Sequence, residues 1–222
     1  MSAYADTRAR VEDYFDRTAT EVWEKLTSDA PVSRIRATVR AGRARMGALM
    51  LSRLPADLSG ARVLDAGCGT GQMTAALAAR GAEVVAVDIS PALIDIAARR
   101  LPEAHRGRVQ FIAGDMLAAD LGRFDHVVAM DSLIYYTAPD IGGALDRLGA
   151  RTRGRIVFTV APRTPLLMAF WTLGRAFPRA DRSPTMIPQS LAPLQAASRA
   201  PVARIGRISS GFYISECLEV AS

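Results

Sequence analysis

The stretch Val63-Leu-Asp-Ala-Gly-Cys-Gly-Thr-Gly71 decides the fold of this 222-residue chain. A short apolar segment, 62–65, leads into three glycines at alternate positions, and an alanine-rich segment, 70–80, follows them. Glycine lets the backbone turn sharply and lets a ligand approach it closely, because no Cβ stands in the way. The stretch therefore predicts a strand, a tight binding loop and a helix, which together open a nucleotide-binding α/β domain.

The spacing of the glycines separates several kinds of nucleotide site. The loop reads G-x-G-x-G and lacks the third glycine position of the dinucleotide fingerprint G-x-G-x-x-G. A phosphate-binding P-loop would end in Gly-Lys-Ser/Thr, whereas this loop continues as Gly71-Gln-Met73. The loop therefore favours a nucleotide that is not held through phosphates.

Acidic residues follow the next two predicted strands, 84–87 and 109–112, as Asp88 and Asp115. The distance from Gly67 to Asp88 is 21 residues, near the spacing at which an acid binds the ribose hydroxyls of a nucleotide. A carboxylate at that place accepts two charge-assisted hydrogen bonds from a cis-diol. Together with Asp65, just before the glycine turn, these acids predict a site for a cationic nucleotide without phosphate.

The rest of the chain continues the alternation of strands and helices. Further strands are expected at 126–130, 155–160, 202–208 and 212–220, with helices at 91–101 and 141–148. This order predicts an α/β fold with a Rossmann-like seven-stranded sheet, mostly parallel with the last strand antiparallel, and helices on both faces. Two further helices precede this unit as an N-terminal extension.

Three parts are expected along the chain. They are an N-terminal helical cap at 1–58, a nucleotide-binding core at 59–160, and a C-terminal substrate-side segment at 161–222 that completes the same sheet. In the second helix of the cap, an apolar stripe runs from Ile35 to Leu49. The arginines of that helix fall mostly outside the stripe, and we interpret them as a solvated face: Arg34, Arg36, Arg40, Arg43 and Arg45.

The chain is basic, with a formal net charge of +6. Between Arg147 and Arg207 there are eleven arginines and one acid, Asp181. Such a segment predicts a basic face that meets an anionic substrate, an acidic protein or a membrane surface.

Other classes of site have little support in the sequence. Cys68 and Cys217 lie far apart and there are only two histidines, so neither a protein-bound metal nor a disulfide framework is expected. The polar N-terminus lacks the apolar core of a signal peptide. The longest apolar stretch, 165–173, is about half of what a membrane span requires. We therefore expect a cytoplasmic protein.

The stretch 63–71 resembles the first motif of small-molecule S-adenosylmethionine-dependent methyltransferases. Asp88-Ile-Ser90 and Gly114-Asp-Met116 resemble their second and third motifs. In that family the glycine loop contacts the methionine part of the cofactor, the acid matching Asp88 holds the ribose, and the residues matching Asp115 and Met116 border the adenine. The resemblance implies S-adenosylmethionine as methyl donor, bound by Asp65, Gly67, Cys68, Gly69, Gly71, Asp88, Ile89, Ser90, Asp115, Met116, Asp131 and Ser132.

Segments outside the core resemble the magnesium protoporphyrin IX methyltransferases of (bacterio)chlorophyll synthesis. They are 11–17 with Trp23, 131–136, and 158–165 with 173–178. The resemblance implies methyl transfer to one propionate of the magnesium porphyrin, which gives a monomethyl ester in bacteriochlorophyll biosynthesis. It also suggests docking to the large porphyrin-binding subunit of magnesium chelatase.

The chemistry of a carboxylate acceptor fits the residues of this chain. A propionate with a pKa near 4.3 is already ionised at neutral pH and requires no general base. Neither His105 nor His126 lies in a convincing nucleophile–base arrangement. Cyanobacterial and plant-type members carry His-Tyr where this chain has Tyr135-Tyr136, and a tyrosine where it has Thr27. We expect Tyr135 to act at the catalytic site as a hydroxyl donor.

Substrate contacts are expected from Tyr136, Arg163 and Trp171. Arg163 is placed to hold a propionate, and the apolar segment 165–171 to hold the flat macrocycle. An ordinary amphipathic helix packed on the sheet explains that segment equally well. The stretch 165–177, with Arg175, Arg179 and Arg182, also suggests loose attachment to the photosynthetic membrane.

Three rival functions remain open. A methyltransferase for a quinone or another apolar small molecule would share the core. A nucleic-acid methyltransferase usually has Asn/Asp-Pro-Pro-Tyr/Phe after the fourth strand, where this chain has Asp131-Ser-Leu-Ile134, so nucleic acid is not an expected partner. The third rival is a protein that binds the cofactor without catalysis.

Overall fold

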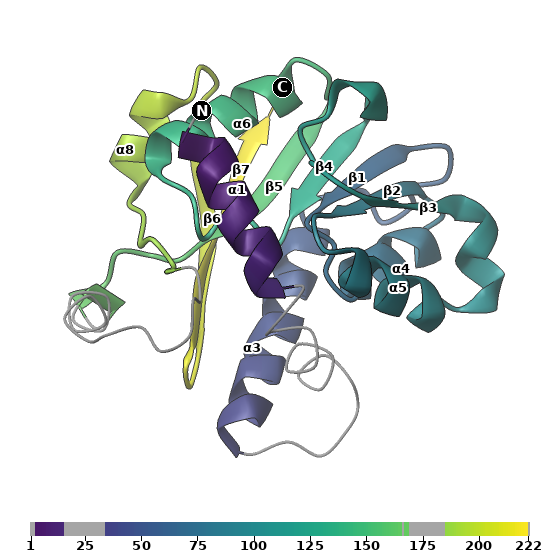
Figure 1. Cartoon of the computed structure of the whole chain (residues 1–222), viewed down its shortest axis with the longest axis horizontal. Coiled ribbons are helices and arrows are strands. Elements are labelled where there is room, and N and C mark those ends of the chain that lie inside the picture. Colours follow the sequence, from purple (N-terminus) through teal and green to yellow (C-terminus); the bar gives the residue numbers. More distant parts are fainter. Residues whose placement is uncertain (1–2, 16–33, 166, 169–184, 222) are drawn as a thin grey trace.

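The computed structural model describes residues 3–15, 34–165, 167–168 and 185–221 and contains one seven-stranded sheet (Figure 1). The order of the strands across the sheet is β3-β2-β1-β4-β5-β7-β6. The strands are β1 (Arg62–Ala66), β2 (Glu83–Asp88), β3 (Val109–Ala113), β4 (His126–Ala129), β5 (Arg155–Val160), β6 (Val202–Ser210) and β7 (Tyr213–Ala221).

Strands β1 to β5 are parallel, and β7 runs antiparallel to both of its neighbours, β5 and β6. The predicted α/β sheet, with its antiparallel last strand, is confirmed. From β1 the chain first builds outward to β2 and β3, and then returns to add β4 on the other side of β1. Such a reversal places a crevice outside the carboxyl ends of the two central strands, where open α/β sheets bind ligands.

Helices cover both faces of this sheet. On one face lie α3 (Arg34–Leu51), α4 (Gln72–Ala79) and α5 (Pro91–Arg100), and on the other lie α6 (Ala138–Gly149) and α8 (Leu191–Ala197). Side chains of a strand alternate between the two faces. In β1, Val63 joins the core under α3 and α4, and Leu64 joins the core under α6. Both residues are fully buried.

The bounds expected for the core elements agree with the structure to within three residues. Local signals explain the helix starts. Ser90 caps α5 by accepting a hydrogen bond from the Leu93 N–H at 3.4 Å, and Thr137 caps α6 in the same way through Asp140. Helix α8 and two short 3-10 helices, η2 (Glu103–Arg108) and η3 (Ala119–Leu121), were not predicted.

The N-terminal helix α1 (Ala3–Tyr14) reaches the carboxyl ends of the strands. In Figure 1 it crosses the view in front of β5 to β7. The ring of Tyr4 stacks on Tyr136, with ring centroids 5.0 Å apart. Within the described part of the chain, no helix is long and apolar enough to cross a membrane.

The arginines between 147 and 207 do not form one free basic face. Arg155 pairs with Glu219 at 2.5 Å, and Arg204 and Arg207 pair with Glu216 at 3.1 and 3.0 Å. Both glutamates are buried, so these guanidiniums neutralise carboxylates that the fold places under the surface. The positive charge of these three arginines is therefore largely balanced within the fold, and the expectation of a partner-binding face stays a prediction. Arg175, Arg179 and Arg182 lie outside the described residues.

The contact between α6 and α8 depends on Gly142. A Cβ built there would lie 2.3 Å from the carbonyl oxygen of Ala197, which is backbone and cannot swing away. We expect Gly142→Ala to lower the free energy of unfolding by about 1–3 kcal/mol in urea denaturation.

The neighbouring Gly143→Ala is the matched control. A Cβ there meets no atom within 4 Å, so the better helix propensity of alanine should stabilise the protein by up to about 1 kcal/mol. Equal effects of the two substitutions would contradict the assigned contact.

Candidate functional site

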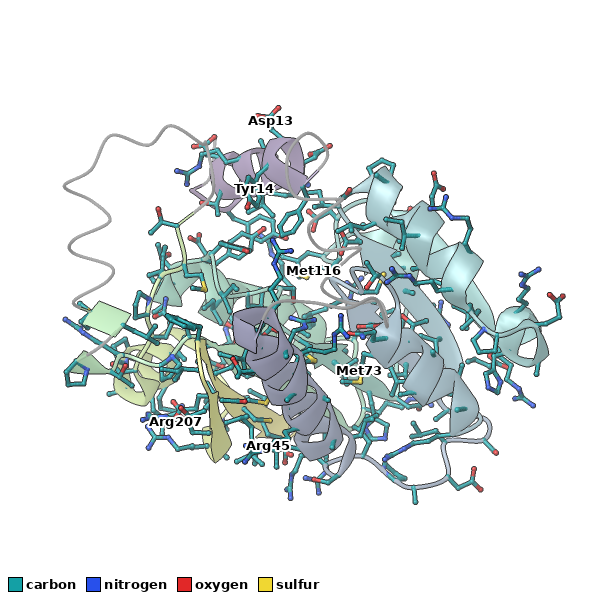
Figure 2. All side chains as sticks on the ribbon, turned by 90° about the horizontal axis from the view of Figure 1, so that it is seen from below. Asp13, Tyr14, Arg45, Met73, Met116 and Arg207 are labelled. Carbon is teal, nitrogen blue, oxygen red and sulfur yellow. The ribbon has the colours of Figure 1, made fainter. Side chains whose placement is uncertain are left out.

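A cleft opens at the carboxyl ends of β1, β2 and β4, with an empty volume of about 1000 Å³ that includes its open mouth. Helices α1 and α3 contribute to its walls. In Figure 2, Met116 lies between α1 and α3, and Met73 lies beside α3. Twelve of the residues predicted from the sequence line the cleft: Asp65, Gly67, Cys68, Gly69, Asp88, Ile89, Asp115, Met116, Asp131, Ser132, Tyr135 and Tyr136.

The glycine loop after β1 lies directly against the loop after β4. Gly67 has φ +81°, and a Cβ there would lie 2.3 Å from the Cβ of Ser132. The Ser132 hydroxyl donates to the carbonyl of Ala66 at 2.8 Å. Gly69 also has a positive φ, but a Cβ there would meet no atom within 4 Å. This glycine therefore leaves space in the cleft that a ligand can fill.

Two predicted cofactor residues do not line the cleft, Gly71 and Ser90. A Cβ at Gly71 would lie 2.9 Å from the Cβ of Ala97, so this glycine lets the start of α4 approach α5. Ser90 is fully buried and caps α5. Both residues support the loops that border the cleft without lining it themselves.

Asp88 is fixed by the backbone around it. The Gly69 N–H donates to its Oδ2 at 2.8 Å and the Ser90 N–H donates to its Oδ1 at 3.0 Å. The two backbone hydrogen bonds, one to each oxygen, hold the carboxylate in one orientation. Because Asp88 borders the cleft, its carboxylate can hold a diol there.

Asp65 is the most deeply buried acid of the site. The Thr74 hydroxyl donates to its Oδ2 at 2.6 Å. Burial penalises the charged form and raises the pKa of Asp65 to about 7, while the Thr74 hydrogen bond opposes that shift and nearby Asp88 adds to it. Near neutral pH the site therefore contains a carboxyl that gains or loses its proton easily.

Asp115 connects the cleft to α1. Its carboxylate accepts hydrogen bonds from the Tyr4 hydroxyl at 2.9 Å, from Arg8 Nη1 at 2.7 Å and from the Leu117 N–H at 2.9 Å. Tyr4 and Arg8 were not predicted from the sequence as site residues. A signal existed, because Tyr4, Arg8, Val11 and Phe15 recur at helical spacing and all four line the cleft.

Asp131 lies at the end of the cleft near α3 and has φ +57°, rare for a residue with a side chain. Its Oδ1 accepts from the Thr159 hydroxyl at 3.1 Å and from the Tyr213 hydroxyl at 3.2 Å. Its Oδ2 forms an ion pair with Arg43. Arg43 was expected on a solvated helix face, and that expectation is wrong, because its side chain is only 16% exposed.

Tyr135 and Tyr136 both line the cleft. The ring of Tyr135 meets Phe15 edge to face, with the centroids 6.3 Å apart. Burial, followed by nearby Tyr14 and then by the negative charge of Asp131, raises the pKa of Tyr135 well above its ordinary value. Burial likewise raises the pKa of the Cys68 thiol. At neutral pH the cleft therefore presents a neutral phenol and a neutral thiol.

The remaining predicted residues lie elsewhere. Arg163 is exposed just beyond β5 and does not line the cleft, and Trp171 lies outside the described residues. His126 is the first residue of β4 and lies at the amino ends of the strands, opposite the cleft. There its Nδ1 accepts a hydrogen bond from the Arg155 N–H at 3.1 Å. His105 lies in η2. Neither histidine is among the residues that line the cleft.

The charge of the cleft favours a cation. Among the described residues that line it, four are aspartates and two, Arg8 and Arg43, are arginines. Carboxylates held by hydrogen bonds in a partly buried site attract positive charge more strongly than the same groups in water. A ligand with net positive charge and hydroxyl groups fits this arrangement.

Known proteins with similar sequences match over nearly the whole chain. The family model described as magnesium-protoporphyrin IX methyltransferase C-terminus matches residues 129–222, and a methyltransferase-domain model matches 63–153. The magnesium-protoporphyrin O-methyltransferase of Rhodobacter capsulatus is 63% identical over 98% of each chain. The chloroplastic magnesium protoporphyrin IX methyltransferase of Arabidopsis thaliana is 30% identical over 94% of this chain and 69% of its own length.

A solved structure shares the fold. The crystal structure of magnesium protoporphyrin IX methyltransferase from Synechocystis PCC 6803 with bound SAH matches with a TM-score of 0.81 and 27% identity. The match covers 96% of this chain and 99% of that one.

The raised pKa of Asp65 predicts how stability depends on pH. Because its pKa is about 7 in the fold and 3.8 without burial, the folded state holds a proton that the unfolded chain releases between these values. The bound proton stabilises the folded wild type at low pH, and this stabilisation should be lost as pH rises from about 4 to 7. Asp65→Asn removes the titration. From about pH 5 to pH 7, the free energy of unfolding of the wild type should fall by about 2 kcal/mol relative to that of Asp65→Asn.

Urea denaturation at several pH values measures this difference. Asp120→Asn, at an exposed position, controls for the loss of one acidic residue. A difference between Asp65→Asn and wild type that does not change with pH would show that Asp65 titrates normally in the fold.

Proposed function

The chain belongs to the magnesium-protoporphyrin O-methyltransferase family, and we propose that it transfers a methyl group from S-adenosylmethionine to a propionate carboxylate of magnesium protoporphyrin IX. The product is the monomethyl ester, a step of bacteriochlorophyll synthesis. The observation that carries the proposal is the 63% identity to the Rhodobacter capsulatus enzyme, which extends over 98% of both chains. That similarity includes the parts of the chain outside the nucleotide-binding core.

The cleft fits S-adenosylmethionine, which supplies a methyl group on a positively charged sulfur. We assign Asp88 to the ribose hydroxyls, because its carboxylate is oriented by two backbone N–H groups and borders the cleft. Asp115 and Met116, at the end of β3, are assigned to the adenine side. The open space above Gly69 admits the ligand close to the backbone.

We propose that the protein speeds the reaction by positioning the acceptor carboxylate against the methyl donor and supplies no general base. A propionate carboxylate is ionised at neutral pH, so no proton has to be removed before it reacts. The cleft agrees with this, because its phenol and thiol are held neutral and neither histidine lines it. Alignment of two reactants in a site that excludes water can supply on the order of 7–11 kcal/mol.

Tyr135 is the residue that we assign to the acceptor carboxylate. Its raised pKa keeps the hydroxyl proton in place, which allows the phenol to donate a hydrogen bond and prevents it from acting as a base. Tyr136 is assigned to the macrocycle beside it. Arg163, exposed beyond β5, is assigned to a propionate, and Trp171, which lies outside the described residues, is assigned to the macrocycle.

Two contacts of the whole enzyme are part of the proposal. The family resemblance supports docking to the large porphyrin-binding subunit of magnesium chelatase, which would deliver the substrate. The apolar product supports loose attachment to the photosynthetic membrane, from which high salt should release the protein.

Incubation with methyl-labelled S-adenosylmethionine and magnesium protoporphyrin IX tests the proposed reaction. Label should enter the porphyrin as an ester that mild base removes. The dimethyl ester of the same porphyrin is the matched control and should take up no label, because both of its carboxylates are blocked. Label that resists base, or that enters the blocked porphyrin, would contradict carboxylate methylation.

Replacing Tyr135 tests its role as an orienting donor. Tyr135→Phe should slow the single-turnover rate by at most about tenfold, equivalent to roughly 1.4 kcal/mol, because the carboxylate remains a nucleophile without the hydroxyl. Single turnovers are the appropriate measurement, since product release can hide the chemical step at steady state. A loss of a thousandfold or more in a folded variant would instead make Tyr135 a principal catalytic group.

A further inference from the structure

The loop after β3 is held by an arginine that does not itself line the cleft. Arg151 follows α6, and its side chain is half-buried. Its Nη2 donates to the carbonyl of Met116 at 2.8 Å, and its Nη1 donates to the carbonyl of Ala118. Met116 lines the cleft, whereas Arg151 is not among the described residues that line it. One side chain outside the cleft therefore binds two carbonyls of a loop that borders it.

The surroundings of Arg151 fix its position. Its N–H donates to the carbonyl of Leu148 in the last turn of α6 at 3.1 Å, and its carbonyl accepts from the Phe124 N–H at 2.9 Å. The guanidinium carbon lies 5.7 Å from the centroid of the Phe124 ring, which is buried. The side chain therefore reaches the loop from a backbone that is held on both sides.

Packing alone does not explain an arginine at this place. Its Nε is buried and has no hydrogen-bond partner among the described residues. Burial lowers the pKa of Arg151, although the nearby carboxylates of Asp115 and Asp120 act in the opposite direction. A buried donor without an acceptor and a partly desolvated charge both destabilise a fold. An apolar side chain of similar length would fill the same space without either effect.

A single peptide group connects Arg151 with Asp115. The carbonyl of the Met116–Leu117 peptide accepts from Arg151, and the N–H of the same peptide donates to Oδ1 of Asp115 at 2.9 Å. A peptide group is planar, so the direction of its carbonyl fixes the direction of its N–H. The carbonyl faces the cation and the N–H faces the anion, so both charges stabilise the same orientation of this peptide. Arg151 therefore orients a group that in turn orients the Asp115 carboxylate.

The second carbonyl that Arg151 binds belongs to the same turn of the chain. The Ala118 N–H donates to the Asp115 carbonyl at 3.0 Å, which closes a turn over 115–118. Both contacts of the guanidinium therefore act on this turn. The hydrogen bonds from α1 to the same carboxylate connect Asp115 to another element, whereas the turn sets its place on the loop.

We propose that Arg151 is a positioning residue that sets the base selectivity of the methyl-donor site, acting through the Met116–Leu117 peptide on Asp115. The inference rests on the proposed function, in which Asp115 lies on the adenine side. An ionised carboxylate can only accept hydrogen bonds. It therefore favours a base with an amino group, such as adenine, over hypoxanthine, which has a carbonyl oxygen at that place. A carboxylate that is no longer held in position should lose part of this preference.

Arg62 is the matched control, because it packs on the same ring. Its guanidinium carbon lies 4.7 Å from the centroid of Phe124, and its Nη1 donates to the carbonyls of Leu121 and Arg123 at 3.0 and 2.7 Å. Both carbonyls lie beyond the turn at 115–118, so Arg62 holds the far end of the loop. Loss of either arginine should destabilise the fold, but only the loss of Arg151 should change the selectivity for the base.

Calorimetry with two ligands that differ only in the base measures this selectivity. S-adenosylhomocysteine carries adenine, and S-inosylhomocysteine carries hypoxanthine on the same ribose and amino-acid end. The wild type should bind the adenine compound more tightly by about tenfold or more, as expected for a hydrogen bond to a charged group. Arg151→Met should weaken S-adenosylhomocysteine by about threefold to tenfold and leave S-inosylhomocysteine nearly unchanged.

Three further variants show whether the effect passes through Asp115. Asp115→Ala should remove the preference for adenine, and adding Arg151→Met to Asp115→Ala should change the preference no further. Arg151→Lys keeps the charge but lacks the planar fork that holds two carbonyls, so it should retain only part of the preference. Arg62→Met should lower the free energy of unfolding in urea, as Arg151→Met does, and keep the preference of the wild type.

The inference is overturned if Arg151→Met weakens both compounds equally or weakens neither. It is also overturned if Arg62→Met reduces the preference as much as Arg151→Met, or if the wild type binds both compounds equally. Should Arg151→Met not fold, Arg151→Lys decides, because an unchanged preference in that variant would refute the role of Arg151. The proposed function fails separately. Absence of porphyrin methylation would leave the base selectivity intact, whereas a wild type that binds neither compound would overturn both proposals.

Discussion

The close approach of the loop after β1 to the loop after β4 is the contact on which the rest of the site depends. It arises between β1 and β4, where the order in which the parallel strands are added to the sheet changes direction. Gly67 makes the approach possible, because a side chain there would occupy the place of the Ser132 side chain. The Ser132 hydroxyl then joins the loops through the Ala66 carbonyl. The contact between the two loops therefore holds Asp65, at the end of β1, close to Asp131, just after β4.

The acids around this contact are organised before any ligand arrives. Each is held by a different kind of donor: Asp65 by a hydroxyl, Asp88 by two backbone N–H groups, Asp115 by α1, and Asp131 by the cluster that reaches it from α3, β5 and β7. Groups fixed in this way have little reorganisation left to undergo, which is how a protein site stabilises charge better than water does. A positively charged methyl donor and an ionised acceptor are the reactants that such a site suits, and neither has to exchange a proton with the protein.

Much of this arrangement could be predicted from the sequence, because it depends on local order. The strand, glycine loop and helix around 63–71 are contiguous, and Asp88 and Asp115 follow from the rule that parallel strands end at one edge of a sheet. Arg43 could not be assigned in this way. Its helix shows where the apolar stripe lies, but which polar residue turns toward Asp131 depends on the contact of Gly42 with Tyr213, about 170 residues away along the chain. Arg163 shows the converse, since it follows β5 closely in sequence and yet lies outside the cleft.

The central claim is that methyl transfer requires the donor and the acceptor carboxylate to be aligned and requires no general base from the protein. The pH dependence of the single-turnover rate, with donor and porphyrin both saturating, tests it most directly, because saturation removes the effect of pH on the binding of either reactant. The account predicts a rate that is nearly constant between about pH 6.5 and 9, since the propionate is already ionised throughout that range. A steep rise with a pKa near 7 that disappears in Asp65→Asn, or when His126 or His105 is replaced, would contradict it.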